Sequence, residues 1–123
     1  MSRYKFECPH CKQSYKITLY HPGYSDVIPV RCSKCSIHTD FDIYDGRVRE
    51  LYKRGGQELF EEALASCECG GRFSEDAPYR CRVCNHAVSI EEIKAQTRAW
   101  FGAARLGRRI GREHVLPKHK TNS

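Results

Sequence analysis

The chain has 123 residues, with eight cysteines, seven Tyr, five Phe and one Trp, and a formal net charge of +6. No apolar run is long enough to cross a bilayer, and residues 1–6 carry no secretory signal. We therefore expect a cytoplasmic protein with reduced thiols and no membrane partner. The alternative is a secreted disulfide-rich domain, which the Cys-x-x-Cys spacing disfavours.

The positive charge is concentrated at the C-terminal end. Residues 1–93 hold thirteen Lys or Arg against fourteen Asp or Glu, whereas residues 94–123 hold eight against one. A divalent ion with four thiolates adds about −2, so metal binding would make the body more acidic still. This asymmetry indicates a basic segment that meets an anionic partner.

Short strands are predicted in the first part of the chain, residues 1–46. Apolar and polar residues alternate in 4–6 and 14–20, and a turn at Pro22 and Gly23 precedes a returning strand at 27–30. Ile37, Phe41 and Ile43 mark a last strand. Residues 47–66 are predicted to connect this unit to the next, with a break at Gly55 and Gly56 and a helix over 57–65.

A second unit is predicted over residues 67–104, with strands at 72–74 and 79–80. Asn85 follows a cysteine turn and is expected in the left-handed conformation, which Asn tolerates. Ser89 and Glu92 form a capping box for a helix that reaches about Phe101. Residues 105–123 are predicted to be a basic tail, of which the last dozen residues are loosely ordered.

The eight cysteines form four close pairs, which is typical of two tetrathiolate metal sites. Chain order suggests that each site closes within its own unit. The predicted ligands are Cys8, Cys11, Cys32 and Cys35 for the first site, and Cys67, Cys69, Cys81 and Cys84 for the second. Zinc is expected in both, and iron is the main rival because four thiolates also suit it.

These cysteine turns resemble the knuckles of zinc ribbons. The resemblance covers residues 4–90 and is carried by Cys-Pro-His-Cys at 8–11, Cys-Ser-Lys-Cys at 32–35, Cys-Gly-Gly-Arg-Phe at 69–73 and Tyr-Arg-Cys-Arg-Val-Cys at 79–84. It implies a small metal-stabilised α+β fold of two tandem zinc-ribbon-like units, joined by a short helix and followed by a C-terminal helix and a basic tail. Zinc ribbons include both nucleic-acid-binding modules and protein-binding adaptors, so the resemblance does not choose between them. The Cys-x-Cys pair at 67–69 departs from the usual knuckle spacing.

Catalysis is not expected from this sequence. Catalytic zinc keeps an open position, whereas four thiolates close each predicted site. His10, His38 and His86 lie in or just beyond the metal turns, and we interpret them as neighbours of the sites rather than ligands. Phosphate loops and nucleophile elbows are absent from the sequence, and no small-molecule substrate is expected.

The predicted function is binding. The leading hypothesis is contact with nucleic acid through Arg98, Trp100, Arg105, Arg108, Arg109 and Arg112, because arginines bind phosphates and aromatic rings stack on bases. Trp100 can instead close the core of the second unit, with the arginines serving only solubility. The alternative function is a protein-binding adaptor, or an inhibitor or immunity-type protein, that uses the acidic body.

Overall fold

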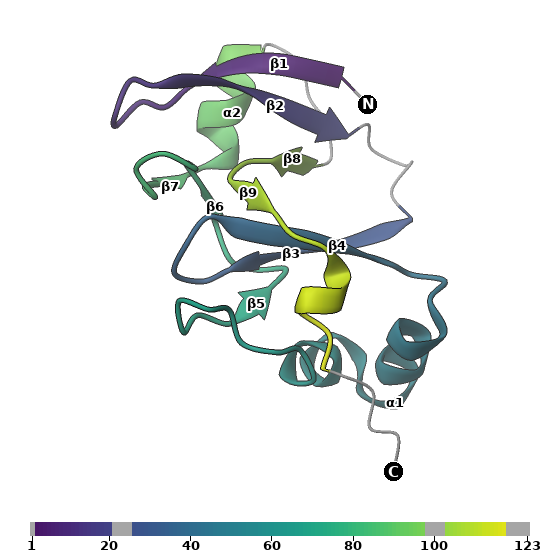
Figure 1. The fold of residues 1–123 in the computed structure, drawn as a ribbon. Coiled ribbons are helices and arrows are strands. Elements are labelled where there is room, and N and C mark those ends of the chain that lie inside the picture. Colours follow the sequence, from purple (N-terminus) through teal and green to yellow (C-terminus); the bar gives the residue numbers. More distant parts are fainter. Residues whose placement is uncertain (1, 21–25, 98–102, 118–123) are drawn as a thin grey trace.

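Residues 2–20, 26–97 and 103–117 are described by a computed structural model, in which short strands and two helices form a small α+β fold (Figure 1). This confirms the predicted fold class at the level of α+β. The elements are β1 (Ser2–Glu7), β2 (Ser14–Tyr20), β3 (Val27–Cys32), β4 (Ile37–Asp42), α1 (Gly46–Glu62), β5 (Phe73–Ser74), β6 (Tyr79–Arg80), β7 (Ala87–Val88), α2 (Ile90–Thr97), β8 (Ala103–Arg105), β9 (Arg108–Arg109) and the 3-10 helix η1 (Arg112–His114).

The elements separate into two lobes, each with its own apolar core. Lobe 1, defined as residues 2–20, 79–97 and 103–106, contains the antiparallel sheet β1-β2-β8, the hairpin β6-β7 and α2 (Figure 1). Alternation in β1 and β2 points Phe6, Tyr15 and Ile17 inward, as expected for strands with one solvated face. These three residues pack with Tyr79, Val88, Ile93 and Leu106.

Lobe 2, defined as residues 26–78 and 107–117, contains the sheet β5-β3-β4-β9, helix α1 and η1 (Figure 1). Strands β3 and β4 are antiparallel, and β9 adds in parallel to β4. The core contains Val30, Phe41, Val48, Phe60, Phe73, Val115 and Leu116. Phe41 and Phe60 meet edge to face with ring centroids 5.2 Å apart, which joins α1 to the sheet.

Helix α1 begins earlier than the sequence pattern predicts. The Asp45 carboxylate accepts a hydrogen bond of 2.9 Å from the Arg47 N–H and caps the helix at its first turn. The predicted break is present as a kink at Gly56, whose φ of 70° lies in the left-handed region. The helix continues on both sides of the kink because Val48 and Phe60 are buried against the same core.

Helix α2 begins at the predicted capping box. The Glu92 N–H donates to the Ser89 hydroxyl at 3.1 Å, and the Ser89 N–H donates to the Glu92 carboxylate at 2.8 Å. The described helix ends at Thr97, and its predicted extension to Phe101 lies outside the described residues. Neither helix within the described ranges is long and apolar enough to cross a membrane.

The segment from 103 to 117 completes both lobes. Strand β8 pairs with β2, β9 pairs with β4, and Leu106, Val115 and Leu116 are buried. Residues 105–117 are therefore part of the folded lobes rather than a tail, because their few apolar side chains fill positions in two separate cores. The predicted loose order is wrong for residues 112–117. The last residues of that prediction, 118–123, lie outside the described part of the chain.

Candidate metal centres

Four cysteines of lobe 1 bring their sulfurs together, and we call this group site 1: Cys8, Cys11, Cys81 and Cys84. All four Sγ atoms lie within 4.8 Å of one another. The Sγ atoms of Cys8 and Cys84 are 3.7 Å apart, and those of Cys11 and Cys81 are 3.9 Å apart. Cys8 and Cys81 are fully buried, so the group is anchored in the lobe 1 core.

Site 1 is built from two knuckles, the tight Cys-x-x-Cys turns, that have the same local structure. In each knuckle the N–H four residues after the first cysteine donates to its carbonyl at 2.9 Å, from Lys12 to Cys8 and from Asn85 to Cys81. Lys12 and Asn85 both have positive φ, 66° and 67°. The prediction for Asn85 is thus confirmed, and Lys12 is the equivalent residue in the other knuckle. Within the turns, backbone N–H groups of His10 and Val83 donate to the sulfurs of Cys8 and Cys81.

A second group lies in lobe 2, and we call it site 2: Cys32, Cys35, Cys67 and Cys69. The Sγ atoms of Cys32 and Cys69 are 3.3 Å apart, and those of Cys35 and Cys67 are 3.6 Å apart. The Cys-x-Cys pair at 67–69 can supply two ligands to site 2 because the backbone makes a tight turn over residues 67–71. The Gly70 N–H donates to the Cys67 carbonyl at 2.8 Å, and the Cys67 N–H donates to the Gly71 carbonyl at 2.9 Å.

Gly71 is needed for site 2 to close. A Cβ atom at this position would overlap the sulfur of Cys32 and would lie 3.1 Å from the Lys34 backbone nitrogen. The Gly-Gly dipeptide after Cys69 therefore lets one ligand loop approach the opposite knuckle. This explains on steric grounds why a pair with tighter spacing still meets the Cys32–Cys35 turn.

Each group can hold a metal ion. A tetrahedral ion with metal–sulfur bonds of about 2.3 Å separates its sulfurs by about 3.8 Å. The two sulfur separations given for site 1 differ from this value by about 0.1 Å, and those given for site 2 are shorter. All eight predicted ligand cysteines are thus gathered into two four-thiol groups.

The predicted grouping of the ligands is wrong. Each site takes one pair from the first half of the chain and one from the second, so the pairs alternate between sites along the sequence. The physical reason is the pairing of strands: β5, just after Cys69, pairs with β3, which ends at Cys32. Cys81 and Cys84 then pack in the lobe 1 core with Phe6 and Tyr15.

The surroundings of the cysteine thiols shift their pKa values in opposite directions. Burial raises the pKa of Cys35 to about 12. Burial also opposes ionisation of Cys81, but the Tyr15 hydroxyl beside it and the knuckle N–H groups together lower the pKa of Cys81 to about 6. A bound cation reverses the penalty on Cys35, since a coordinating thiol is deprotonated outright.

The two sites are linked by hydrogen bonds between their knuckles. The Arg80 guanidinium donates to the Ser33 carbonyl at 3.0 Å, and the Asn85 side-chain amide donates to the Lys34 carbonyl at 2.7 Å. Ser33 and Lys34 are the central residues of the Cys32–Cys35 knuckle. No local sequence pattern marks a contact between knuckles. Arg80 was therefore not predicted as a linking residue, and only a backbone role was predicted for Asn85.

The six predicted binding residues do not form one described cluster. Arg98 and Trp100 lie outside the described residues, and Arg105 lies in β8 opposite Thr18. Arg108 and Arg109 lie in β9 on lobe 2 and are exposed. Arg109 lies 4.0 Å from the Asp40 carboxylate, which is only 6% exposed.

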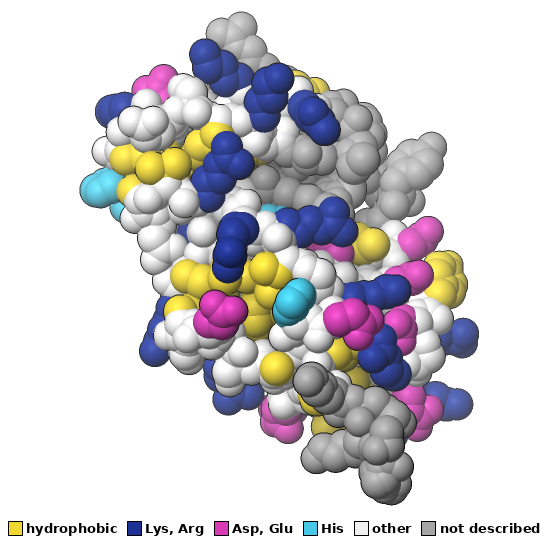
Figure 2. Space-filling model, in the orientation of Figure 1, with side chains coloured by type: hydrophobic (Ala, Val, Ile, Leu, Met, Phe, Trp, Pro, Cys, Tyr) yellow, Lys and Arg dark blue, Asp and Glu magenta, His cyan; other side chains and the backbone are white. Residues whose placement is uncertain are grey.

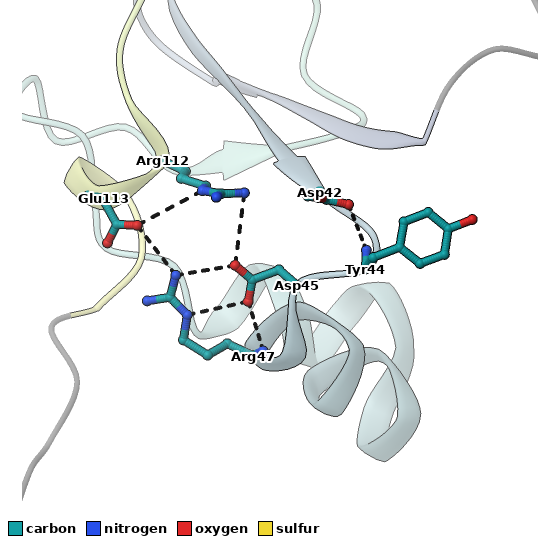
Figure 3. Close-up of polar contacts among 6 residues, drawn as sticks. All are labelled: Asp42, Tyr44, Asp45, Arg47, Arg112 and Glu113. Atoms are coloured by element: carbon teal, nitrogen blue, oxygen red, sulfur yellow. Dashed lines mark hydrogen bonds and ion pairs between the residues drawn. The ribbon is translucent and has the colours of Figure 1, made fainter.

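Arg112 is part of an ion-pair network that joins η1 to the start of α1 (Figure 3). Its guanidinium lies 3.9 Å from Asp45 and 4.0 Å from Glu113, while Arg47 lies 3.4 Å from each of these carboxylates. The hydrogen bond from Arg47 lowers the pKa of Asp45. Arg112 thus contacts carboxylates of its own chain, which weakens its assignment as a phosphate ligand.

Among the described residues, charge is divided between the two lobes. Lobe 1 holds eight Lys or Arg against three Asp or Glu, a net of +5, whereas lobe 2 holds ten against twelve, a net of −2. A divalent ion in each site would lower these values to about +3 and −4. In Figure 2, Lys and Arg gather at the upper end of the molecule, the end of β1 and β2 in Figure 1, and most visible Asp and Glu lie lower.

Comparison with protein families shows to which family this chain belongs. A family model described as Domain of unknown function (DUF8255) matches residues 4–90. The chain belongs to this family. The matched range contains all eight cysteines and therefore both candidate metal sites, and it ends at the first residue of α2. Neither the curated proteins nor the solved structures give a match to the chain.

Proposed function

We propose that this chain is a non-catalytic module in which two zinc ions stabilise a two-lobed scaffold that contacts nucleic acid. The observation that carries the proposal is the pair of four-thiol groups, one in each core, together with the net positive charge of lobe 1. Structural metal ions supply folding free energy to small domains, and a basic surface attracts phosphate.

Zinc suits both sites because four thiolates in a tetrahedron are its usual structural donor set. Such a site leaves no position for water or substrate, which supports a non-catalytic role and no small-molecule substrate. Eight free thiols also fit a reducing compartment such as the cytoplasm. Metal analysis of the purified chain is expected to give two zinc ions, whereas a red, iron-loaded preparation would point to an electron carrier.

Binding to labelled single- and double-stranded DNA and RNA, measured with zinc-loaded and nuclease-treated protein across a salt series, tests the nucleic-acid part. We expect binding that weakens steeply as salt rises, because phosphate contacts release counterions. No binding at low salt would overturn it. Full-length variants are preferable to a C-terminal truncation, since Leu106, Val115 and Leu116 belong to the two cores.

A second candidate function is favoured by the charge of lobe 2. Its net negative charge repels phosphate and suits a basic protein partner, as expected for an adaptor or an inhibitor or immunity-type protein. Tyr44, with 65% of its surface exposed, lies on this lobe beside the acidic residues Asp42 and Asp45 (Figure 3). A stoichiometric protein partner that survives nuclease treatment would favour this function over the first.

A further inference from the structure

The outer face of the sheet β1-β2-β8 is basic. The register places Arg3 opposite Thr18, Lys5 opposite Lys16 and Glu7 opposite Ser14, so these residues share the face opposite to Phe6, Tyr15 and Ile17. Arg3, Lys5 and Lys16 are all exposed. On the other edge of β2, Arg105 of β8 is the register partner of Thr18.

This arrangement places like charges directly opposite each other. Lys5 and Lys16 face one another across the β1–β2 ladder, and directly opposed like charges destabilise a sheet. Within the described ranges, no ion pair neutralises Arg3, Lys5 or Lys16. Of the described side chains on this face only Glu7 is acidic, and it lies at the end of the strand next to the knuckle.

The face also offers a place for a small anion. A shallow groove is lined by Arg3, Lys5, Ser14 and Lys16 together with Tyr4 and Tyr15. Arg can bind a phosphate through two N–H groups, Lys acts as a point charge, and the Ser14 hydroxyl can donate one further hydrogen bond. Arg3 and Lys5, two residues apart on one strand, are separated along it by about 7 Å.

We propose that this outer face, centred on Arg3, Lys5 and Lys16, binds the phosphate backbone of a nucleic acid. The proposal rests on the nucleic-acid function proposed above and assigns it to a surface that the sequence analysis did not consider. The charged side chains of this face, Arg3, Lys5 and Lys16, suit phosphates rather than base edges. The binding is therefore independent of sequence and common to duplexes and single strands.

The test compares two full-length variants with the same change in charge. Arg3→Gln, Lys5→Gln and Lys16→Gln together remove three positive charges from the outer face. Arg49→Gln, Lys53→Gln and Arg54→Gln together remove three exposed positive charges from α1 on lobe 2 and serve as the matched control. All six side chains are exposed, and the first variant also relieves the Lys5–Lys16 repulsion, so both are expected to fold and to bind two metal ions.

A plot of log affinity against log salt has a negative slope, and we expect its magnitude to be smaller by about 3 for the outer-face variant. Each lost phosphate contact removes roughly 0.9 from this magnitude. When salt rises from 50 to 200 mM, the affinity of this variant should therefore fall by a factor about 40 times smaller than the affinity of the unchanged chain. The α1 variant should retain the affinity and slope of the unchanged chain. Two duplexes of unrelated sequence should give the same result.

Equal binding by both variants and the unchanged chain would overturn the assignment of the surface and leave the proposed function standing. Loss of binding in a variant with Arg108→Gln, Arg109→Gln and Arg112→Gln, but not in the outer-face variant, would return the contact to the C-terminal arginines. Absence of any binding by the unchanged chain, or binding to anionic lipid vesicles but not to nucleic acid, would contradict the proposed function itself.

Discussion

At the residue scale, the crossed ligand sets make a prediction about paired cysteine substitutions. Cys11→Ser with Cys84→Ser disables site 1 alone, so one metal ion per chain should remain. Cys11→Ser with Cys35→Ser disables both sites, so none should remain in native coordination. Native mass spectrometry of the zinc-loaded variants counts the ions. The opposite ranking, with one ion kept by the second variant, would restore the grouping by chain order.

His38 provides a second prediction, about pH. It is 6% exposed in β4. Burial lowers the pKa of His38 from 6.5 to about 4, and the charges of Arg109 and Arg31 lower it further. The hydrogen bond that the imidazole donates to the Gly107 backbone raises the pKa and offsets this only in part. Between these pH values the unfolded chain binds a proton that the folded chain does not. The contribution of neutral His38 to the free energy of unfolding is therefore complete above pH 6.5 and is lost as the pH falls towards 4. The full loss is about 3 kcal/mol at about 1.4 kcal/mol per pH unit.

Cysteine protonation also releases metal at low pH, so the His38 imidazole should be followed directly by NMR in the metal-loaded chain. Its ring signals should stay unchanged from pH 8 to 5. A His38→Gln variant lacks the imidazole signals and so confirms their assignment. Its free energy of unfolding should also lack the part of the decrease between pH 6.5 and 4 that comes from His38. A midpoint near 6.5 in the folded protein would contradict the burial argument.

At the scale of elements, Gly107 fixes the crossing of the chain from β8 in lobe 1 to β9 in lobe 2. Its φ is +85°, and a Cβ atom there would overlap the Ser36 carbonyl, which accepts a hydrogen bond of 2.9 Å from the Arg108 N–H. Backbone strain at such a position costs about 1–3 kcal/mol before any clash is counted. Gly107→Ala should therefore lower the free energy of unfolding by about 2 kcal/mol or more.

Gly46→Ala is the control for this substitution, because a Cβ atom at Gly46 meets nothing within 4 Å. Gly46 is the first residue of α1, where Ala is a better helix former, so the control should be neutral or slightly stabilising. Denaturant unfolding of both metal-loaded variants measures the difference. Equal stabilities would show that β9 can shift away from Ser36 without cost.

The sequence predicted what is local and missed what is distant. Ser89 and Glu92, Asn85 and the alternation in β1 and β2 each act within a few residues, and all of them were found as predicted. The four cysteine pairs are also local features and were recognised, but their spacing is compatible both with the grouping by chain order and with the crossed grouping. Which pairs meet depends on contacts such as β5 with β3, which no short pattern carries.

The C-terminal strands were missed for a related reason. Strand β9 has only two residues, both Arg, and β8 has three, so neither shows alternation that would distinguish a strand from a charged tail. Leu106, Ile110, Val115 and Leu116 are the strongly apolar residues of the segment 103–117, and their packing follows from cores made elsewhere in the chain. The basic outer face escaped notice because its charges come together only once β1 and β2 are in register.

At the scale of the whole molecule, both lobes depend on both ends of the chain. A cut between Ala65 and Ser66 would leave Cys8, Cys11, Cys32 and Cys35 on one fragment and the other four cysteines on the second. Each fragment would then hold half of site 1, half of site 2 and part of each core. We expect neither fragment alone to show dispersed amide NMR signals with zinc.

Mixing the two fragments with two equivalents of zinc should restore the spectrum of the intact chain, because the metal ions and the β3–β5 pairing rejoin them. The matched control is a mixture in which the second fragment carries Cys81→Ser and Cys84→Ser, which should restore only the signals of lobe 2. A native-like spectrum from residues 1–65 alone would contradict the crossed arrangement. Four cysteines from one half of the chain would then suffice for a folded metal site, and the two lobes would be consecutive units after all.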